Sequence, residues 1–269
     1  MSKGRLLIAL VVAVISLFGY FGKSVMNPVT DEKQHVGGVT AEQEVALGLQ
    51  AAPEMAQQFG GLHPDERVQS AIKQVCGRLL QRSEASRSGY PFDCHVLADP
   101  QTVNAFALPG GQVFITAALL DRLSTEGQLA GVLGHEIGHV VARHGAEHIA
   151  KQQLTQGLTG AAVLATYDPS NPSTQSSAAV AMLVGQLVNM RFGRADELES
   201  DKLGVQFASE AGYDPRSMIE VMHILAESGG GSRQPEFFST HPNPENRIER
   251  IEQTIQEQYP NGVPAGLEK

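Results

Sequence analysis

The sequence predicts a mainly helical α+β fold with one small β-sheet, and three observations support this fold class. Apolar residues recur at helical spacing over most of the chain after residue 40. Two stretches, 92–99 and 103–116, have the composition of strands, and both precede the helix that carries the main polar motif. About 220 residues without an internal repeat suit a single domain, which we place at residues 40–260 with a short tail at 261–269.

Residues 1–24 predict an export or anchoring segment. Lys3 and Arg5 precede an uncharged apolar run of 17 residues, from 6 to 22, intermediate between the about 7–15 of a signal-peptide core and the about 20 of a membrane span. No good small-x-small cleavage site follows, so we expect an uncleaved membrane anchor, with a cleaved signal peptide as the alternative. The charges ahead of the run place the folded domain in the periplasm, anchored to the inner membrane or free. Residues 25–39, with proline and a Gly-Gly pair, predict a tether.

Charge and cysteine content limit the possible partners and metal ligands. The net charge is −9 and no Lys/Arg run follows the first few residues, which excludes nucleic acid as an expected partner. Cys76 and Cys94 are the two cysteines of the chain. In an exported protein they form either a disulfide or two separate buried thiols. A metal would have to be held by histidine and carboxylate side chains.

Local signals mark the elements of the domain in chain order. A capping-box pattern at Thr40 opens a helix that runs to about residue 58, and residues 66–82 repeat apolar side chains at helical spacing. The stretch 92–99 is predicted to be a strand, and a Pro-Gly-Gly turn divides 103–116 into a hairpin. We expect two further helical segments, one over residues 178–212 and a charged one near the C-terminus after a Gly- and Pro-rich loop.

A second capping pattern, beginning at Thr125, opens the helix that carries the stretch "GHEIGH". His135 and His139 are four residues apart, so a helix points both imidazoles to one place and provides half of a metal site. Glu136 is rotated from His135 by about 100°, which suits a base that stands beside the metal. Zinc is the expected metal, because it binds imidazole and carboxylate and takes three protein ligands in catalytic sites.

The third ligand is expected in "RADELESD", residues 194–201, which follows a helical pattern. Glu197 and Asp201 are four apart and share a helix face. This spacing suits a metal ligand and a carboxylate that hydrogen-bonds the outer nitrogen of a ligand histidine. By spacing alone Glu199 and Asp196 compete with Glu197, and a solvated acidic face is a further alternative.

Two later histidines follow the motif on the same predicted helix. His144 and His148 come nine residues after His135 and His139. On a continuous helix this spacing is a rotation of about 180°. We therefore expect both to face away from the metal.

Four motifs together resemble one family of metallopeptidases. They are "NAFALPGGQVFIT" at 104–116, "HEIGH" at 135–139, "ELESD" at 197–201 and "STHPNPENRIERI" at 239–251. In this order they resemble the gluzincin family that includes the CAAX prenyl proteases and the HtpX-like, Oma-type and BepA/LoiP-like proteases, which implies a zincin-like fold. The chain is similar to the single-anchor periplasmic branch, since its longest apolar stretch after the N-terminal run has 11 residues, too few to span a membrane.

The resemblance implies roles for individual residues. It makes Glu197 the third zinc ligand beside His135 and His139, and Asp201 the carboxylate that supports the site. The residue before Asp201 is serine, where the family usually has alanine. The resemblance also places His241, of the His-Pro motif, near the metal. There it could donate to the oxyanion or close over the zinc as a fourth ligand.

These motifs predict a metalloendopeptidase with one Zn²⁺ per chain, in which Glu136 acts as the base and the substrates are envelope proteins under quality control. We expect an extended substrate to add to the strand before the Pro-Gly-Gly turn, with Asn104 and Ala105 contacting its backbone, unless the hairpin is purely structural. A second interpretation is a zinc-dependent binding or chaperone-like protein whose site His241 keeps shut. Glu136 favours the enzyme, because a binder needs ligands but no base. A hydrolase of small amides is disfavoured by a strand suited to peptide backbone.

Overall fold

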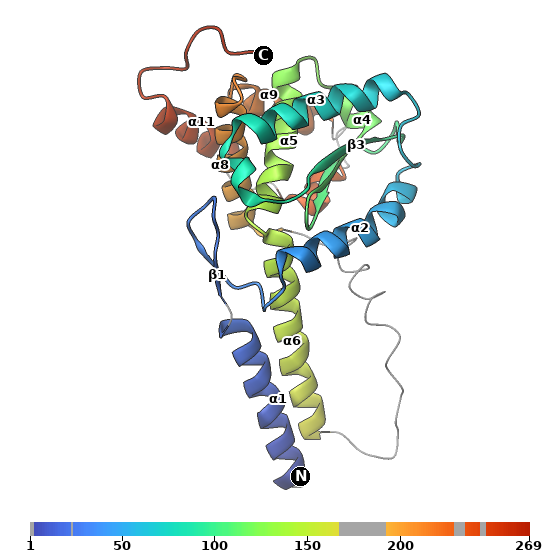
Figure 1. The fold of residues 1–269 in the computed structure, drawn as a ribbon, viewed down its shortest axis with the longest axis vertical. Helices are drawn as coiled ribbons and strands as arrows, with labels where there is room; N and C mark the ends of the chain where they lie inside the picture. The colour runs from blue at the N-terminus through green and yellow to red at the C-terminus, as the bar shows by residue number, and fades with distance from the viewer. Residues whose placement is uncertain (1–2, 23, 167–191, 229–234, 243–245) are drawn as a thin grey trace.

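The small sheet lies against the central helix in a computed structural model that describes residues 3–22, 24–166, 192–228, 235–242 and 246–269 (Figure 1). Its strands follow the order β3-β5-β4, in which β4 and β5 form the predicted antiparallel hairpin and β3 pairs parallel with β5. Strand β4 is therefore an edge strand, and the mainly helical α+β prediction is confirmed. The three strands are β3 (Asp93–Leu97), β4 (Ala105–Leu108) and β5 (Gln112–Thr116).

The helices around the sheet begin at residues with clear capping signals. The Thr40 side chain accepts from the backbone N–H of Gln43, whose own side chain accepts from the Thr40 N–H, so the predicted capping box is present. The Thr125 side chain caps the central helix by accepting from Gln128 N–H. The elements are α2 (Ala41–Gln58), α3 (Glu66–Arg82), the 3₁₀ turn η1 (Glu84–Ser88), α4 (Ala117–Leu120), α5 (Glu126–Val141), α6 (His144–Thr166), α8 (Arg194–Glu210), α9 (Ser217–Glu227), α10 (Phe237–Thr240) and α11 (Arg247–Gln258).

The long helix predicted for residues 178–212 is not continuous, because residues 192 and 193 are not helical. Helix α8 starts at Arg194, while Gly193 before it is extended. The Gly193 N–H donates to the Asp196 side chain at 2.7 Å, and this local cap fixes where the helix begins. Residues 178–191 of the prediction lie outside the described residues.

The expectation of one continuous helix through His144 and His148 is wrong. Helix α5 ends at Val141, and Arg143 adopts a left-handed conformation with φ of 56° before α6 begins. The Arg143 guanidinium is buried against the Glu44 carboxylate and the Val39 carbonyl, which hold this unusual backbone in place. The chain changes direction here, so spacing counted along a straight helix does not apply beyond residue 143.

Helices α5 and α8 pack unusually closely because glycines line their contact. A Cβ atom added at Gly138 would lie 3.1 Å from the Ser200 carbonyl oxygen, and one at Gly134 would lie 3.1 Å from that of Gly204. One at Gly204 would lie 2.9 Å from the backbone nitrogen of His135. The two glycines inside "GHEIGH" therefore let the backbones approach, which brings the α5 histidines to the α8 carboxylates.

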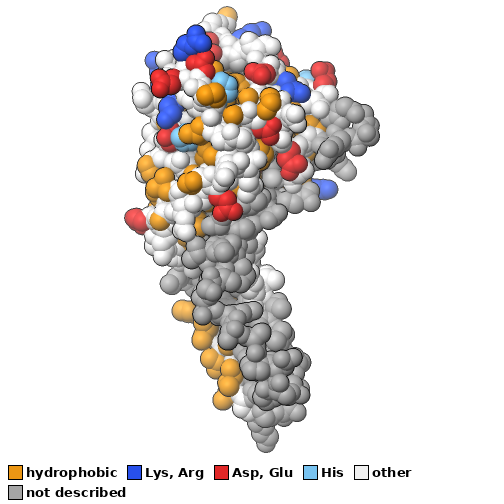
Figure 2. Space-filling model, turned by 90° about the vertical axis from the view of Figure 1, so that its right-hand side faces the viewer, with side chains coloured by type: hydrophobic (Ala, Val, Ile, Leu, Met, Phe, Trp, Pro, Cys, Tyr) orange, Lys and Arg blue, Asp and Glu red, His pale blue; other side chains and the backbone are white. Residues whose placement is uncertain are grey.

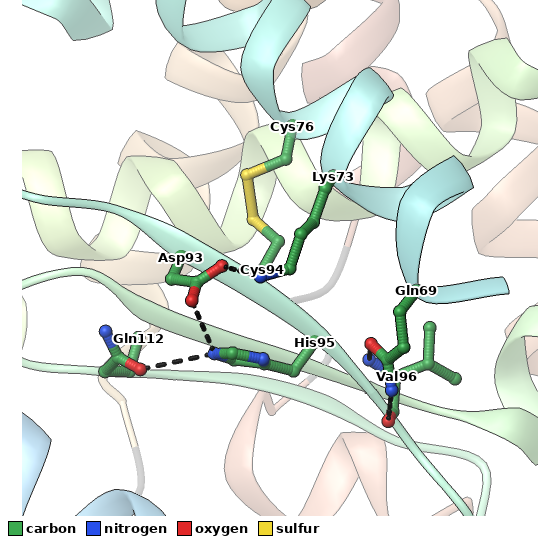
Figure 3. Close-up of a disulfide and its surroundings, with 8 residues drawn as sticks. All are labelled: Gln69, Lys73, Cys76, Asp93, Cys94, His95, Val96 and Gln112. Carbon is green, nitrogen blue, oxygen red and sulfur yellow. Dashed lines mark hydrogen bonds and ion pairs between the residues drawn. A yellow bond between two sulfur atoms is a disulfide. The ribbon is translucent and has the colours of Figure 1, made fainter. Parts of the chain in front are cut away.

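A disulfide joins α3 to the outer strand of the sheet. Cys76 and Cys94 are bonded, with 6.4 Å between their Cα atoms (Figure 3). Both are buried in the main hydrophobic core, so of the two alternatives the disulfide is confirmed. Beside it Lys73 forms an ion pair with Asp93 at 2.8 Å. The disulfide thus fixes β3, which lies at the edge of the sheet opposite β4.

The N-terminal segment forms helix α1 (Lys3–Phe21), which lies along α6 (Figure 1). The contact is close, since a Cβ atom added at Gly157 of α6 would lie 2.1 Å from Ser16 Oγ. In Figure 2 apolar side chains form a strip along one side of the protruding part of the molecule. Among the residues that are described, no helix has both the length and the apolar content of a membrane span. The large exposed side chains of α1 are Leu7, Ile8, Leu10, Val11, Val14, Ile15, Leu17, Phe18 and Phe21.

The predicted tether contains a two-stranded hairpin, β1 (Val25–Met26) and β2 (Lys33–Gln34). The Asn27 side chain donates to the Val141 carbonyl at 2.7 Å, and the Gln34 side chain donates to the Ala142 carbonyl. The segment therefore packs on the junction of α5 and α6, where it satisfies carbonyls at the end of α5.

Candidate metal centre

Helix α5 brings the two motif histidines together in the interior. His135 and His139 are each 2% exposed, and their Nε2 atoms are 3.1 Å apart. They lie one helical turn apart on the face that packs against α8. The spacing in the sequence thus corresponds to two imidazole nitrogens directed at the same point.

Helix α8 provides the carboxylates on the opposite side of this point. Glu197 is fully buried, with Oε1 3.4 Å from His139 Nε2 and Oε2 3.5 Å from His135 Nε2. The two competing acids point elsewhere. Asp196 pairs with His148 at 2.8 Å and Glu199 pairs with His144 at 3.1 Å. The structure therefore distinguishes Glu197 from Asp196 and Glu199 as the acid that faces the two histidines, which sequence spacing alone could not do.

The segment around α10 adds a third imidazole. His241 is fully buried, and its Nδ1 is 3.3 Å from His135 Nε2 and 3.1 Å from Glu197 Oε1. Its ring stacks on Phe237, with 4.5 Å between the ring centres. The donor atoms of His135, His139, Glu197 and His241 all lie within 4.8 Å of one another. We call these four residues the metal cluster.

Glu136 lies beside the metal cluster rather than within it. It is fully buried, and Oε1 is 3.5 Å from His241 Nε2. Neither carboxylate oxygen accepts a hydrogen bond from the described residues. Burial raises the pKa of Glu136 above its ordinary value. A raised pKa makes this carboxylate a stronger base than an exposed glutamate.

The donor set fits a bound cation. Burial would raise the pKa of Glu197, but His241 and His139 outweigh this effect and lower the pKa well below its ordinary value. Burial lowers the pKa of His139 well below its ordinary value. The metal cluster therefore offers a carboxylate and a neutral imidazole, which are the protonation states that a metal requires. Glu197 Oε2 and His241 Nε2 also have no hydrogen-bond partner in the described part of the chain.

His135 is oriented by an acid that is itself fixed by an arginine. His135 Nδ1 is 2.9 Å from Asp201 Oδ1, and the Arg247 guanidinium donates to both Asp201 oxygens at 2.7 and 2.8 Å. Burial would raise the pKa of Asp201, but Arg247 and His135 together lower it. This is the arrangement in which a carboxylate fixes the tautomer of a ligand histidine.

Two contact residues were missed from the sequence, Arg247 and Phe192. Arg247 is 2% exposed and also lies 3.2 Å from Glu197, yet in the sequence it is one of several charges on a C-terminal helix. A signal existed, because Arg247 stands four and eight residues before Ile251 and Ile255 on the buried face of α11. Phe192 stacks on His139 with ring centres 3.9 Å apart, and no pattern in the sequence indicated this contact.

His144 lies at the metal cluster, contrary to the expectation from the sequence. Its Nδ1 is 2.9 Å from His139 Nδ1, and the side chain is 3% exposed. His148 is further out and contacts Asp196 and the ring of Phe192. The helix break at Arg143 turns His144 back toward α8, which is the physical reason for this correction.

The predicted substrate strand contains β4, which is an edge strand of the sheet and is largely buried. The backbone of Asn104 is hydrogen-bonded to β5. Its N–H donates to Thr116 Oγ1 at 3.2 Å, and its carbonyl accepts from Thr116 N–H at 3.0 Å. Ala105, opposite Ile115, is the next position; its backbone groups point away from β5, although the residue itself is fully buried. At the start of this edge the Val103 carbonyl accepts from Phe237 N–H at 3.2 Å. Ala105 is thus better placed than Asn104 to pair with an extended peptide.

Known proteins are similar in sequence to this chain over most of its length. The family model described as Peptidase family M48 matches residues 63–255. The Beta-barrel assembly-enhancing protease of Escherichia coli is 30% identical over 222 residues, which cover 78% of this chain and 45% of that protein. The mitochondrial metalloendopeptidase OMA1 of Schizosaccharomyces pombe is 30% identical over 244 residues, covering 88% of this chain and 68% of that protein. The chain spans less than half the length of the bacterial relative.

Proposed function

This chain belongs to Peptidase family M48, and on that premise we propose that it is a zinc metalloendopeptidase that hydrolyses peptide bonds of proteins. The observation that carries the proposal is the metal cluster, in which four buried donors converge beside an unpaired carboxylate. A purely structural zinc site would need no unpaired carboxylate beside its ligands. The enzyme interpretation therefore explains Glu136, which a binding protein would not require.

We propose that His135, His139 and Glu197 hold one zinc ion per chain. Nitrogen and carboxylate donors without thiolate suit zinc in a catalytic site. When bound, zinc supplies the Lewis acidity that activates water and polarises the peptide carbonyl. Asp201 and Arg247 keep His135 in the tautomer that leaves Nε2 free for binding.

Glu136 is the proposed general base and acid. Its oxygens have no other hydrogen-bond partner among the described residues, and burial raises its pKa, which makes it a stronger base than an ordinary glutamate. It would take a proton from the attacking water and return it to the nitrogen of the leaving amine. The enclosed site keeps other water molecules from competing for this carboxylate.

His241 is proposed to close the resting site. Its Nδ1 lies within reach of both His135 and Glu197, where it would occupy the position that water or substrate needs. The same segment donates from Phe237 N–H to the Val103 carbonyl at the sheet edge, so moving it would free the metal cluster and the edge together. We expect His241→Ala to raise casein cleavage, by up to about tenfold if the closed form dominates by that ratio. Unchanged or lower cleavage would contradict this role.

The proposed substrates are proteins that add as a further strand to β4 near Ala105. Two features support an envelope location. Residues 3–21 expose a row of large apolar side chains suited to a membrane anchor, and the bacterial relative is named for the assembly of β-barrels. We therefore propose quality control of envelope proteins by a periplasmic domain. Carbonate extraction of membranes would test the anchor, because an anchored chain stays in the pellet.

The proposal is tested by measuring zinc content and casein cleavage of the purified full chain, with and without chelator. We expect about one zinc per chain and cleavage that chelator abolishes and added zinc restores. Glu136→Gln should keep the zinc and lose cleavage. Zinc bound one to one without cleavage, in the wild type and in His241→Ala, would instead support the zinc-dependent binding protein. Absence of zinc from the wild type would contradict both functions.

A further inference from the structure

The two ligand histidines on α5 differ in what holds their outer nitrogens. His135 Nδ1 meets the carboxylate of Asp201, the usual partner of a metal-binding histidine. His139 Nδ1 instead meets a second imidazole, the Nδ1 of His144, at 2.9 Å. Both rings are buried, and their centres are 5.0 Å apart with the planes inclined at 72°. The His139 side of the metal cluster therefore has a different kind of support.

The direction of the hydrogen bonds follows from the outermost partner. His144 Nε2 is 3.1 Å from Glu199 Oε2, and a carboxylate can only accept, so the proton lies on His144 Nε2. Nδ1 of a neutral His144 then carries a lone pair, and its nearest donor is His139 Nδ1 at 2.9 Å, ahead of the Ser200 hydroxyl at 3.3 Å. His139 is left with a bare Nε2, which faces His135 Nε2 and Glu197. One chain of hydrogen bonds thus fixes the tautomer of the ligand.

The backbone is shaped to place His144 there. His144 is the first residue of α6, directly after the left-handed Arg143, and Arg143 is held by Glu44 from α2. Ser200 Oγ lies 3.3 Å from His144 Nδ1, which adds a polar contact from α8. A non-glycine residue with positive φ is uncommon and persists only where its surroundings impose it. Here that conformation turns His144 toward His139 instead of away from it.

We propose that His144, supported by Glu199, is a positioning residue that orients His139 for metal binding. The inference rests on the proposed zinc site. In it, His144 and Glu199 support His139 as Asp201 and Arg247 support His135. The support of His139 reaches the surface, because it ends at Glu199, which is partly exposed. The support of His135 is buried at both Asp201 and Arg247.

The test measures the zinc dissociation constant of the full chain by competition with a chromophoric chelator. His144→Phe keeps the ring volume but removes the acceptor, and we expect it to weaken zinc binding by about 10–100-fold. His144→Asn places an oxygen where Nδ1 was and should restore most of the affinity. His148→Phe is the matched control, because His148 also pairs with an α8 acid and contacts Phe192 but does not touch His139. It should leave the dissociation constant close to that of the wild type.

A second readout does not depend on bound metal. Nitrogen-15 NMR of the zinc-free wild type should show the His139 proton on Nδ1, and His144→Phe should lose that preference while His144→Asn keeps it. Equal zinc affinity in His144→Phe and wild type would overturn the inference and leave the zinc site intact. An equal loss in His148→Phe would also overturn it, since the effect would then reflect packing alone. A wild type that binds no zinc would overturn the proposed function and this inference with it.

Discussion

The sheet and the metal cluster are neighbours in the fold but are built on opposite principles. In the sheet every residue of β5 is buried, the backbone groups pair in register, and a disulfide fixes the outer strand. At the metal cluster the buried side chains carry charge. Eight buried polar side-chain atoms have no hydrogen-bond partner in the described residues, and five of them belong to Glu136, Glu197, His241 and Arg247. Such groups destabilise a fold unless something binds them.

The difference indicates where stability and function reside. The sheet packs on α5, and the disulfide ties it to α3, which contacts both α5 and α8. The metal cluster uses that support to keep polar atoms unpaired, which is the state that a metal ion and a proton can use. Substitutions in the two regions should therefore separate activity from stability.

The largest effect is expected from Glu136→Gln. The side chain keeps its size but cannot accept a proton, so turnover should fall by about 10²–10⁴-fold. Zinc content should stay the same, because Glu136 is not among the four donors. Casein hydrolysis and metal analysis of the same preparation measure both quantities. Turnover within an order of magnitude of the wild type would show that another group moves the proton.

The reverse pattern is expected when the disulfide is removed. Cys76→Ser combined with Cys94→Ser opens a loop between residues 18 apart, and the free energy of unfolding should fall by about 3 kcal/mol. Urea titration of the folded protein measures the loss. Activity per folded molecule should be retained, because the bridge joins α3 to β3 on the side of the sheet away from β4. Loss of zinc in the folded variant would show that the two regions are not separable.

The helix contact between the two ligand sets should tolerate no added atom. Gly138→Ala would place its Cβ 3.1 Å from the Ser200 carbonyl oxygen and should lower the free energy of unfolding by about 1–3 kcal/mol. Gly131→Ala is the matched control on α5, where the Cβ would lie 3.5 Å from Met218, an ordinary contact. It should be neutral or stabilising by up to about 1 kcal/mol, since alanine favours helix over glycine. Equal losses would mean that α5 responds to any added volume.

Features that depend on neighbouring residues in the sequence were predicted correctly more often than features that depend on tertiary contacts. Spacing of four residues was enough for His135 and His139, and the capping signal at Thr125 placed their helix, because both depend on neighbours in sequence. His144 could not be placed this way. Its position depends on the backbone at Arg143, which is fixed by Glu44, 99 residues away.

The carboxylates show the same limit. By spacing alone Glu197 had two competitors, and only the packing of α8 on α5 separates the three acids in space. Arg247 was overlooked because a helix with many charges hides the one that points inward. Sequence reasoning therefore identified the donor types, while their selection required the tertiary contacts between helices.

The smallest predicted effect is a pH dependence caused by Glu136, in which folding stability and turnover change in opposite directions. Because burial raises the pKa of Glu136, the folded chain binds this proton more tightly than the unfolded chain, whose glutamates titrate near about 4.3. In zinc-free protein the group therefore stabilises the fold most below that value and loses this contribution as pH rises through the raised pKa. Turnover must change in the opposite direction, since only the ionised carboxylate accepts a proton.

Thermal unfolding of zinc-free wild type and Glu136→Gln across pH 4 to 8 measures the effect. The variant cannot ionise, so its stability relative to the wild type should increase as pH rises through the raised pKa of Glu136. A constant difference would mean that Glu136 titrates alike in the folded and unfolded chains, and that its burial does not prepare it for proton transfer. The disulfide-free variant should show the same pH dependence as the wild type, because no titrating group is changed there.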